Sequence, residues 1–291
     1  MSAHSFALGA RQTWIRAAVA AGLALGAAPL AAQSSAAPTA QPVAQMAPQP
    51  VAVDVGARQM PFSVGEELVY RAYFGGLPVG KARMRVDGIE AVRGRPAYHV
   101  VFSIDGGIPG FRVHDRYESW IDVATLSSLR YRQEISEGRY KKSALYEIYP
   151  EQGVYQKQGD TVRASVRDPL DEGSFIYAVR LAGVRAGETR RYDRYFRPDR
   201  NPVVLSGLRH ETVEVGAGKF STVVVRPTIR ANGLFAENGD AQLWFTDDEN
   251  RYLVQLKSHF SKFSLRLSLE SVTPGNPAAL PTAVAEAMAG Q

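Results

Sequence analysis

The sequence predicts an all-β, mainly antiparallel protein: a curved sheet or an open β-barrel or half-barrel with one packed helix. Short segments of alternating apolar and polar residues recur from about position 61 to 273, and this period of two is typical of half-buried strands. Turn-forming pairs such as Glu137-Gly138 and Gly159-Asp160 separate the segments and favour hairpins between antiparallel neighbours. One stretch, from position 168 onward, has helical spacing instead.

The composition is that of a globular protein and excludes several kinds of chemistry. Of the 291 residues, 45% are hydrophobic and 22% are charged, which is ordinary for a folded domain. There is no cysteine, so disulfides, cysteine nucleophiles, thiolate metal ligands and a lipid-anchored cysteine are excluded. The formal net charge of +5 is too small to indicate a nucleic-acid partner.

Residues 1–32 have the layout of a secretory signal peptide. Arg11 and Arg16 precede an apolar run over residues 17–30, and small residues follow at Ala31-Ala32. A charged start, a short apolar run and a small-residue exit are typical of such leaders. The run of about 14 residues is shorter than the roughly 20 that span a bilayer, although an uncleaved membrane anchor is the alternative. We therefore expect a periplasmic or secreted protein that is not a lipoprotein.

The leader predicts where the mature chain begins. Cleavage after Ala32 gives a mature protein that starts near Gln33. N-terminal sequencing of the exported protein checks this expectation, and a chain that starts at Ser2 would contradict it.

Two segments outside the predicted β domain have the composition of linkers. Residues 33–60 are rich in Ala, Pro and Gln, and such a segment buries too little apolar surface to offset its ordering entropy. Residues 274–291 are predicted to be a flexible tail, with a short helix over the last ten residues as the alternative. Residues 61–273 are predicted to form a single β domain.

The strands can be assigned in order from alternation and turn signals. The clearest is 111–122, where Phe111, Tyr117 and Ile121 share one face and Trp120 lies on the other. The predicted strands are 68–74, 81–86, 96–104, 111–122, 129–135, 140–149, 154–157, 161–166, 190–196, 203–215, 221–229, 241–245, 252–257 and 260–270.

Residues 168–182 are predicted to form the packed helix. Asp168 is placed to cap its free N–H groups, Pro169 suits the first helical position, and Gly183 supplies a stop. The segment is apolar on most sides, with Phe175 and Tyr177 among its residues. It should therefore cover one face or mouth of the sheet.

Two stretches of the chain resemble each other at an offset of about 122 residues. Gly65-Glu66 corresponds to Gly187-Glu188, and Tyr73-Phe74 corresponds to Tyr195-Phe196. Such a repeat predicts two related β units joined through the helix. Chance similarity is the alternative, because these residue types are common in strands and turns.

The order of several segments resembles one bacterial family. The segments are FSVGEELVYRAYFGGLPVGKARMRV, GRPAYHVVF, DPL…FIYAVR…GE, AGKFSTVVVRP, LWFTDDENRYLVQLK and SLRLSLESV, over about residues 61–272. Together they resemble the domain of unknown function 3108 family. The resemblance implies an exported, envelope-associated domain with a curved antiparallel sheet or open barrel, similar to lipoprotein carriers and other lipid-binding half-barrels. It implies no activity and no site residues.

No motif predicts an enzyme, a metal site or a cofactor. The sequence has no G-x-S-x-G, no S-x-x-K and no glycine-rich phosphate loop. Its histidines have no metal-ligand spacing, and Asp247-Asp248-Glu249-Asn250 is better explained as an acidic turn. A catalytic triad dispersed through the sequence would not be visible, so an envelope hydrolase is kept as the third hypothesis.

Aromatic and basic residues supply the candidate binding sites. One set could line an apolar cavity, since an open barrel often holds an apolar ligand; filling a solid core is the alternative. The other set could bind an anion, with a solvated surface as the alternative. The cavity candidates are Tyr70, Tyr73, Phe74, Phe111, Tyr117, Trp120, Phe175 and Trp244; the anion candidates are Arg190, Arg191, Arg194 and Arg197.

The first functional hypothesis is therefore a non-catalytic envelope module that binds a lipid or other apolar ligand. The second is a structural or interaction protein with a solid β core. The expected partners are a lipid or apolar small molecule, an envelope protein or the membrane surface.

Overall fold

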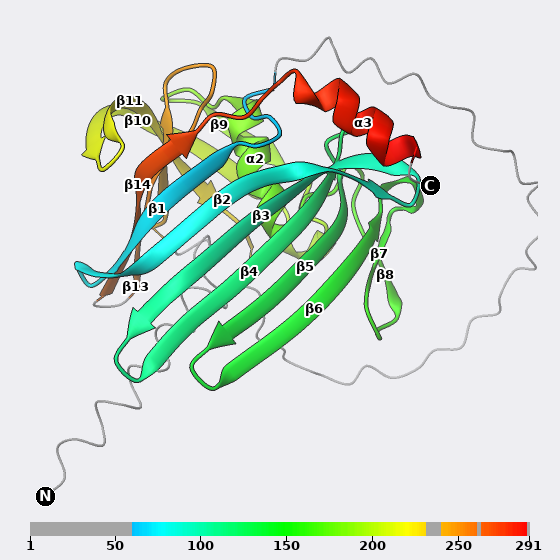
Figure 1. Cartoon of the computed structure of the whole chain (residues 1–291), viewed down its shortest axis with the longest axis horizontal. Helices are drawn as coiled ribbons and strands as arrows, with labels where there is room; N and C mark the ends of the chain where they lie inside the picture. The colour runs from blue at the N-terminus through cyan, green and yellow to red at the C-terminus, as the bar shows by residue number, and fades with distance from the viewer. Residues whose placement is uncertain (1–59, 231–239, 261–262, 290–291) are drawn as a thin grey trace, which may run out of the picture.

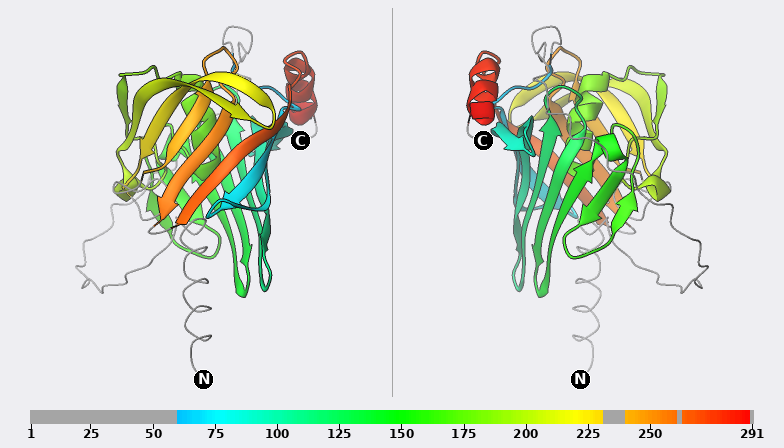
Figure 2. Two further views of the ribbon diagram at one scale, coloured as in Figure 1. Left: turned by 90° about the vertical axis from the view of Figure 1, so that its left-hand side faces the viewer. Right: turned by 90° about the vertical axis from the view of Figure 1, so that its right-hand side faces the viewer.

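The computed structural model describes residues 60–230, 240–260 and 263–289. Within these residues, fourteen strands form one sheet in the order β8-β7-β6-β5-β4-β3-β2-β1-β14-β13-β12-β11-β10-β9. All neighbouring strands are antiparallel. The sheet is strongly curved but its two end strands, β8 and β9, do not pair (Figures 1 and 2). This open half-barrel confirms the predicted fold class.

The structure has one strand for each predicted segment. The strands are β1 (Glu67–Phe74), β2 (Leu77–Val92), β3 (Arg95–Ile108), β4 (Phe111–Asp122), β5 (Ser128–Glu137), β6 (Tyr140–Tyr149), β7 (Val154–Lys157), β8 (Val162–Ala164), β9 (Thr189–Tyr192), β10 (Val203–Val215), β11 (Gly218–Thr228), β12 (Gln242–Thr246), β13 (Leu253–Phe260) and β14 (Phe263–Thr273).

Strands β2 and β3 are longer than predicted because their glycines are not strand ends. The register of this pair shifts between Val86 and Gly88, which is a β-bulge, and β2 continues to Val92. On β3, a Cβ added to Gly106 would lie 2.3 Å from the backbone oxygen of Val79. Glycine at this position allows a close approach of two backbones inside the sheet.

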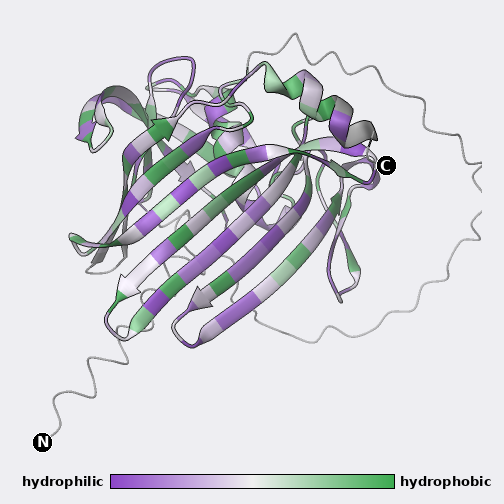
Figure 3. Cartoon of the chain, viewed as in Figure 1, coloured by the Kyte–Doolittle hydropathy of each residue, from purple (hydrophilic) through white to green (hydrophobic). Residues whose placement is uncertain are grey.

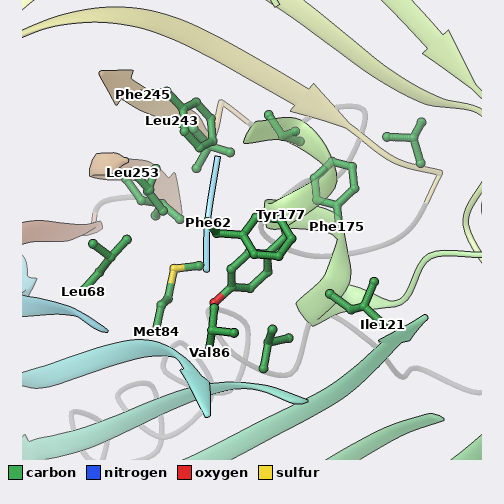
Figure 4. Packing of buried hydrophobic residues seen from close by; sticks show 14 of the residues in the cluster. Phe62, Leu68, Met84, Val86, Ile121, Phe175, Tyr177, Leu243, Phe245 and Leu253 are labelled. Carbon is green, nitrogen blue, oxygen red and sulfur yellow. The ribbon is translucent and has the colours of Figure 1, made fainter. Parts of the chain in front are cut away.

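The main core lies on the concave face of the sheet, around helix α2 (Glu172–Ala182). Hydrophilic and hydrophobic residues alternate along the long strands (Figure 3), so that one face of these strands is apolar. In Figure 4, Tyr177 of α2 lies beside Phe62, with Met84 of β2 next to it and Leu253 of β13 farther away on the same side. The Phe62 and Tyr177 rings meet edge to face, with centroids 4.8 Å apart. The helix is therefore packed against both halves of the sheet.

Helix α2 begins later than predicted. Its N-cap is Asp171, whose carboxylate accepts the backbone N–H groups of Gly173 and Ser174. Asp168 was the predicted cap, but it is exposed and has a φ of +51°. The reason is tertiary: the Leu170 N–H donates to the backbone oxygen of Arg194 at 2.6 Å, which keeps the chain before Asp171 out of the helix. The helix ends at Gly183, as predicted.

The two stretches that resemble each other in sequence also form the same backbone turn. Gly65 and Gly187 have φ angles of +87° and +82°. Their N–H groups donate to Val86 and Gly207 at 2.9 and 2.8 Å, and those two residues donate back to the glutamate after each glycine. A β-bulge follows in both strands, at Val86 and at Gly207. The shared geometry supports the interpretation of two related β units.

The chain continues beyond β14 into a second helix, α3 (Ala279–Ala289). This helix falls within residues 274–291, the predicted flexible tail, and corresponds to the helical alternative. It lies beside β2 and β3 (Figure 1). Leu280 and Val284 pack against the main core, and this apolar contact explains why the segment is ordered. The predicted leader and linker, residues 1–59, lie outside the described residues.

Candidate ligand-binding site

A cavity of about 160 Å³ lies between α2 and the edge of the sheet at β9 and β10. We call it the α2 cavity. It is lined by Phe62, Ile121, Leu126, Leu170, Ser174, Phe175, Tyr177, Ala178, Val179, Leu181, Ala182, Tyr192, Arg194, Tyr195, Val203 and Leu205.

The walls of the α2 cavity are apolar and its exposed side can be located from burial. Phe175, Val203 and Leu205 are among its fully buried lining residues. The half-buried lining residues come from two elements, the outer side of α2 and the segment that starts in β9. They define the mouth of the cavity: Ala178, Leu181, Ala182, Tyr192 and Arg194. The cavity therefore opens where the half-barrel is unclosed.

A buried ion pair holds α2 in place. Arg180 is 1% exposed and Glu66 is 3% exposed, and two of their nitrogen–oxygen pairs are 2.6 and 2.9 Å apart. Arg180 also donates to the backbone oxygens of Asn250, at 2.9 Å, and Pro61. Burial alone lowers the pKa of Arg180, but its bonds to Glu66 outweigh burial and the pKa ends above its ordinary value. The pair joins the helix to both β units.

Hydroxyl groups surround the N-terminus of α2. Asp171 Oδ1 accepts the Ser119 hydroxyl at 2.5 Å as well as the two capping N–H groups. The hydroxyl oxygens of Ser128 and Ser174 are 2.8 Å apart, and both accept the Asp171 N–H. Burial raises the pKa of Asp171 to about 7, although the bond from Ser119 acts in the opposite direction. The helix start is thus tied to β4 and β5.

A second polar group beside the helix start contains Glu172, Tyr195, Lys142 and Arg197. Glu172 accepts the hydroxyl of Tyr195, and Arg197 donates to the hydroxyl of Tyr146 at 2.9 Å. Burial lowers the pKa of Lys142 to about 8, while Glu172 raises it. Lys142 donates to Gln133 at 2.8 Å, and the second carboxylate oxygen of Glu172 is buried without a hydrogen-bond partner among the described residues.

The structure divides the predicted cavity aromatics between two faces. Phe175 is the one that lines the α2 cavity. Tyr70 is in the main core and Tyr117 packs against it, while Phe111 is buried against the Gly138 turn. Phe74 is half-buried at the end of β1.

Three of the predicted aromatics lie elsewhere. Trp120 belongs to a separate cluster with Val92, Ala97 and Leu129, and Trp244 to another with Val213, Val224 and Val254. The guanidinium of Arg266 lies over the ring of Tyr73, 4.0 Å from the ring centroid. The structure does not bring the eight aromatics together, because neighbouring positions of a strand face opposite ways.

The four predicted anion-binding arginines have different partners. Arg190 pairs with Glu188 at 2.7 Å, and Arg197 stacks on Phe196 and Tyr146. Arg191 is exposed on β9. Arg194 is the one that lines the α2 cavity, so the four do not share one ligand.

The described residues contain no group of three or more histidines and carboxylates that could hold a metal ion. His99 contacts Glu90 at 2.8 Å and stacks on Trp120. Among the described residues no helix is both long and apolar enough to cross a bilayer.

Sequence reasoning missed most of the cavity. Leu126, Ala178, Val203 and Leu205 line it but have no distinguishing local pattern. They come from a turn, a helix and a strand far apart in the chain. Only their joint position around α2, near the edge strand β9, identifies them.

The comparisons with known proteins agree with the fold. The model of a family described as "Protein of unknown function (DUF3108)" matches residues 69–270, more than half of the chain. No curated protein matches the sequence. Among solved structures, a beta-barrel-like protein of the DUF1849 family from Brucella abortus superposes with a TM-score of 0.51 at 9% identity, over 74% of this chain and 99% of that one. This likeness concerns the fold alone.

Another similar structure is a candidate lipoprotein from Parabacteroides distasonis. Its TM-score is 0.34 at 11% identity, over 74% of this chain and 99% of that one. A TM-score this low carries no argument about this protein.

Proposed function

Because the chain belongs to the DUF3108 family, whose function is unknown, we propose a function from the chain's own geometry. It is a non-catalytic binding protein of the cell envelope that holds a lipid or other apolar ligand in the α2 cavity. The observation that supports this proposal is an apolar cavity whose mouth lies at the open edge of the half-barrel.

The volume limits what the cavity accepts. Cavities for drug-sized ligands measure roughly 300–1,000 Å³, whereas a dry apolar cavity of about 150 Å³ accepts benzene. At about 160 Å³, the α2 cavity fits a small ring or the end of an acyl chain. The rest of a longer ligand would leave between α2 and β9.

The small volume also favours a second candidate function. Most of the concave face is filled by α2 and the buried side chains around it, as in a structural or interaction protein with a solid core. The two functions differ in whether any apolar molecule occupies the cavity. Native mass spectrometry of protein purified from its own envelope, with extraction of bound lipid, tests this difference directly.

Filling the cavity should abolish binding without unfolding the protein. Ala178→Leu places a larger side chain at the mouth, where Ala178 is half-buried and has room on one side. We expect the affinity for 1-octanol, measured by NMR titration, to fall at least tenfold. The melting temperature should stay within a few degrees, because the added methyl groups fill empty space.

The control is Ala278→Leu, at an exposed position outside the cavity, which should leave 1-octanol binding unchanged. Undiminished binding by Ala178→Leu would place the ligand elsewhere. Absence of both a natural ligand and 1-octanol binding in the wild-type protein would favour the structural function.

A further inference from the structure

We propose that the ligand of the α2 cavity is an amphiphile with an acidic head group, and that Arg194 binds this anion at the mouth. The inference rests on the proposed function and adds the chemical class of the ligand. Arg194 is the one charged side chain among the described residues that line the cavity. It stands at the half-buried rim, opposite the apolar walls.

Among the described residues, the guanidinium of Arg194 hydrogen-bonds to backbone carbonyls and forms no ion pair with a carboxylate. Its Nε donates to the backbone oxygen of Asp168 at 2.7 Å, and its Nη2 donates to that of Leu126 at 3.5 Å. An arginine has five N–H donors, so these contacts leave donors for a ligand. The two carbonyls orient the group without neutralising it.

Arg194 is also partly removed from water. Burial lowers its pKa, and the attraction of Asp168 and Tyr192 only partly opposes this effect. A half-buried cation is costly when no anion compensates its lost hydration. A carboxylate or similar acid at the mouth would supply this compensation, and arginine binds planar acids through two parallel hydrogen bonds.

Backbone hydrogen bonds fix the position of Arg194 beside the cavity. The backbone oxygen of Arg194 accepts the Leu170 N–H at 2.6 Å, and the Leu170 oxygen accepts the Phe196 N–H at 2.9 Å. Leu170 itself lines the cavity. The guanidinium is therefore attached to a firm segment beside the apolar walls.

The neighbouring arginines differ from Arg194 in their partners or in their position relative to the cavity. Arg190 already has a carboxylate partner in Glu188, and Arg197 is buried on Tyr146 and Phe196. Arg191 is exposed and does not line the cavity. Arg191 thus provides a matched control for charge at a distance of three residues.

The experiment compares octanoate with 1-octanol, which share a chain length and differ in charge. Binding to the wild-type, Arg194→Gln, Arg194→Lys and Arg191→Gln proteins is measured by NMR titration. The wild-type protein should bind octanoate at least tenfold more tightly than 1-octanol. Arg194→Gln should lower the octanoate affinity about tenfold and the 1-octanol affinity much less, because 1-octanol has no charge for the guanidinium to bind.

The two controls separate charge at the mouth from general effects. Arg191→Gln should change the octanoate affinity less than twofold. Arg194→Lys should keep part of the preference, because it retains the charge but loses the planar fork. A much smaller loss of 1-octanol affinity than of octanoate affinity in Arg194→Gln shows that the cavity is intact. If that variant is unfolded, the wild-type preference and the Arg194→Lys result decide.

The possible failures are distinct. Equal affinities of the wild-type protein for octanoate and 1-octanol would overturn the role of Arg194 and leave the apolar site standing. An octanoate preference that Arg191→Gln removes and Arg194→Gln retains would also overturn it. Binding of neither compound would instead contradict the proposed function.

Discussion

Replacing Arg180 with methionine should lower the free energy of unfolding by about 3–5 kcal/mol, because it leaves the Glu66 carboxylate buried without its partner. Arg180 and Glu66 are almost completely excluded from solvent. The change also removes the N–H groups that donate hydrogen bonds to the backbone oxygens of Asn250 and Pro61. Urea denaturation at neutral pH measures the loss.

The second β unit contains a matched control for this variant. Glu188 follows Gly187 as Glu66 follows Gly65, and it pairs with Arg190 at 2.7 Å. Both of these side chains are about one-third exposed, and exposed ion pairs contribute about 0–1 kcal/mol. Arg190→Met should therefore cost at most about 1 kcal/mol.

A double variant tests the cause of the loss. Glu66→Leu combined with Arg180→Met removes both charges, and apolar replacement of a whole buried pair is often neutral or stabilising. The double variant should recover most of the stability that Arg180→Met loses. If Arg180→Met costs less than 1 kcal/mol, the pair does not hold α2 against the two β units.

The strands were predictable because their signal is local. Phe111–Asp122 alternates along its length and the structure gives the same bounds. Strands β2 and β3, which are longer than predicted, contain glycines, and a glycine can either end a strand in a turn or form a bulge within it. Gly88 is a turn signal in the sequence but a bulge in β2, and only the facing strand distinguishes these cases.

The face on which a side chain lies was predictable, but the identity of the concave face was not. Alternation puts Tyr117 and Trp120 on opposite sides of one strand. Their surroundings depend on the curvature of the whole sheet, which places Tyr117 against the main core and Trp120 in another cluster. The aromatic residues predicted to line one cavity therefore lie on two different surfaces of the sheet.

The α2 cavity could not be predicted because it forms only when distant segments of the chain pack together in the folded protein. Its walls combine Phe62, Leu126 and Leu205 with α2, and no local pattern links positions so far apart. Arg194 was among the predicted anion-binding residues, but the sequence alone did not separate it from Arg190, Arg191 and Arg197. What distinguishes Arg194 from the other three arginines is its position in the cavity lining and the partners that the others have, and both depend on the folded structure.

The N-cap of α2 shows the same limit on a smaller scale. Asp168-Pro169 is the helix start that the sequence predicts. The backbone bond between Leu170 and Arg194 moves the start to Asp171, and that bond joins segments 24 positions apart. Because Asp171 is the N-cap, its carboxylate is buried among Ser119, Ser128 and Ser174.

Asp171 should make the protein less stable as the pH rises from 5 to 8. Burial raises its pKa from an ordinary 3.8 to about 7 in the folded protein. Between these two values the folded state keeps a proton that the unfolded state has lost, so stability falls with rising pH and levels off above about 7. One pKa unit corresponds to 1.36 kcal/mol, so Asp171 accounts for a loss of roughly 3 kcal/mol over this range.

Asp171→Asn should remove this part of the pH dependence. Asparagine caps helices about as well as aspartate, and its side-chain oxygen can still accept the N–H groups of Gly173 and Ser174. Urea denaturation at pH 5 and pH 8 should show that the variant loses roughly 3 kcal/mol less than the wild-type protein. Asp115, whose pKa burial raises to about 6, leaves a smaller dependence of the same sign.

The control is Asp168→Asn, which changes the exposed aspartate that the sequence predicted as the cap. This variant should keep the wild-type pH dependence, because Asp168 is not the residue that caps α2. The reverse outcome, with Asp168→Asn flattening the profile and Asp171→Asn leaving it unchanged, would place the helix start at Asp168. It would also remove Asp171 from the buried hydroxyl cluster that ties α2 to β4 and β5, beside the α2 cavity.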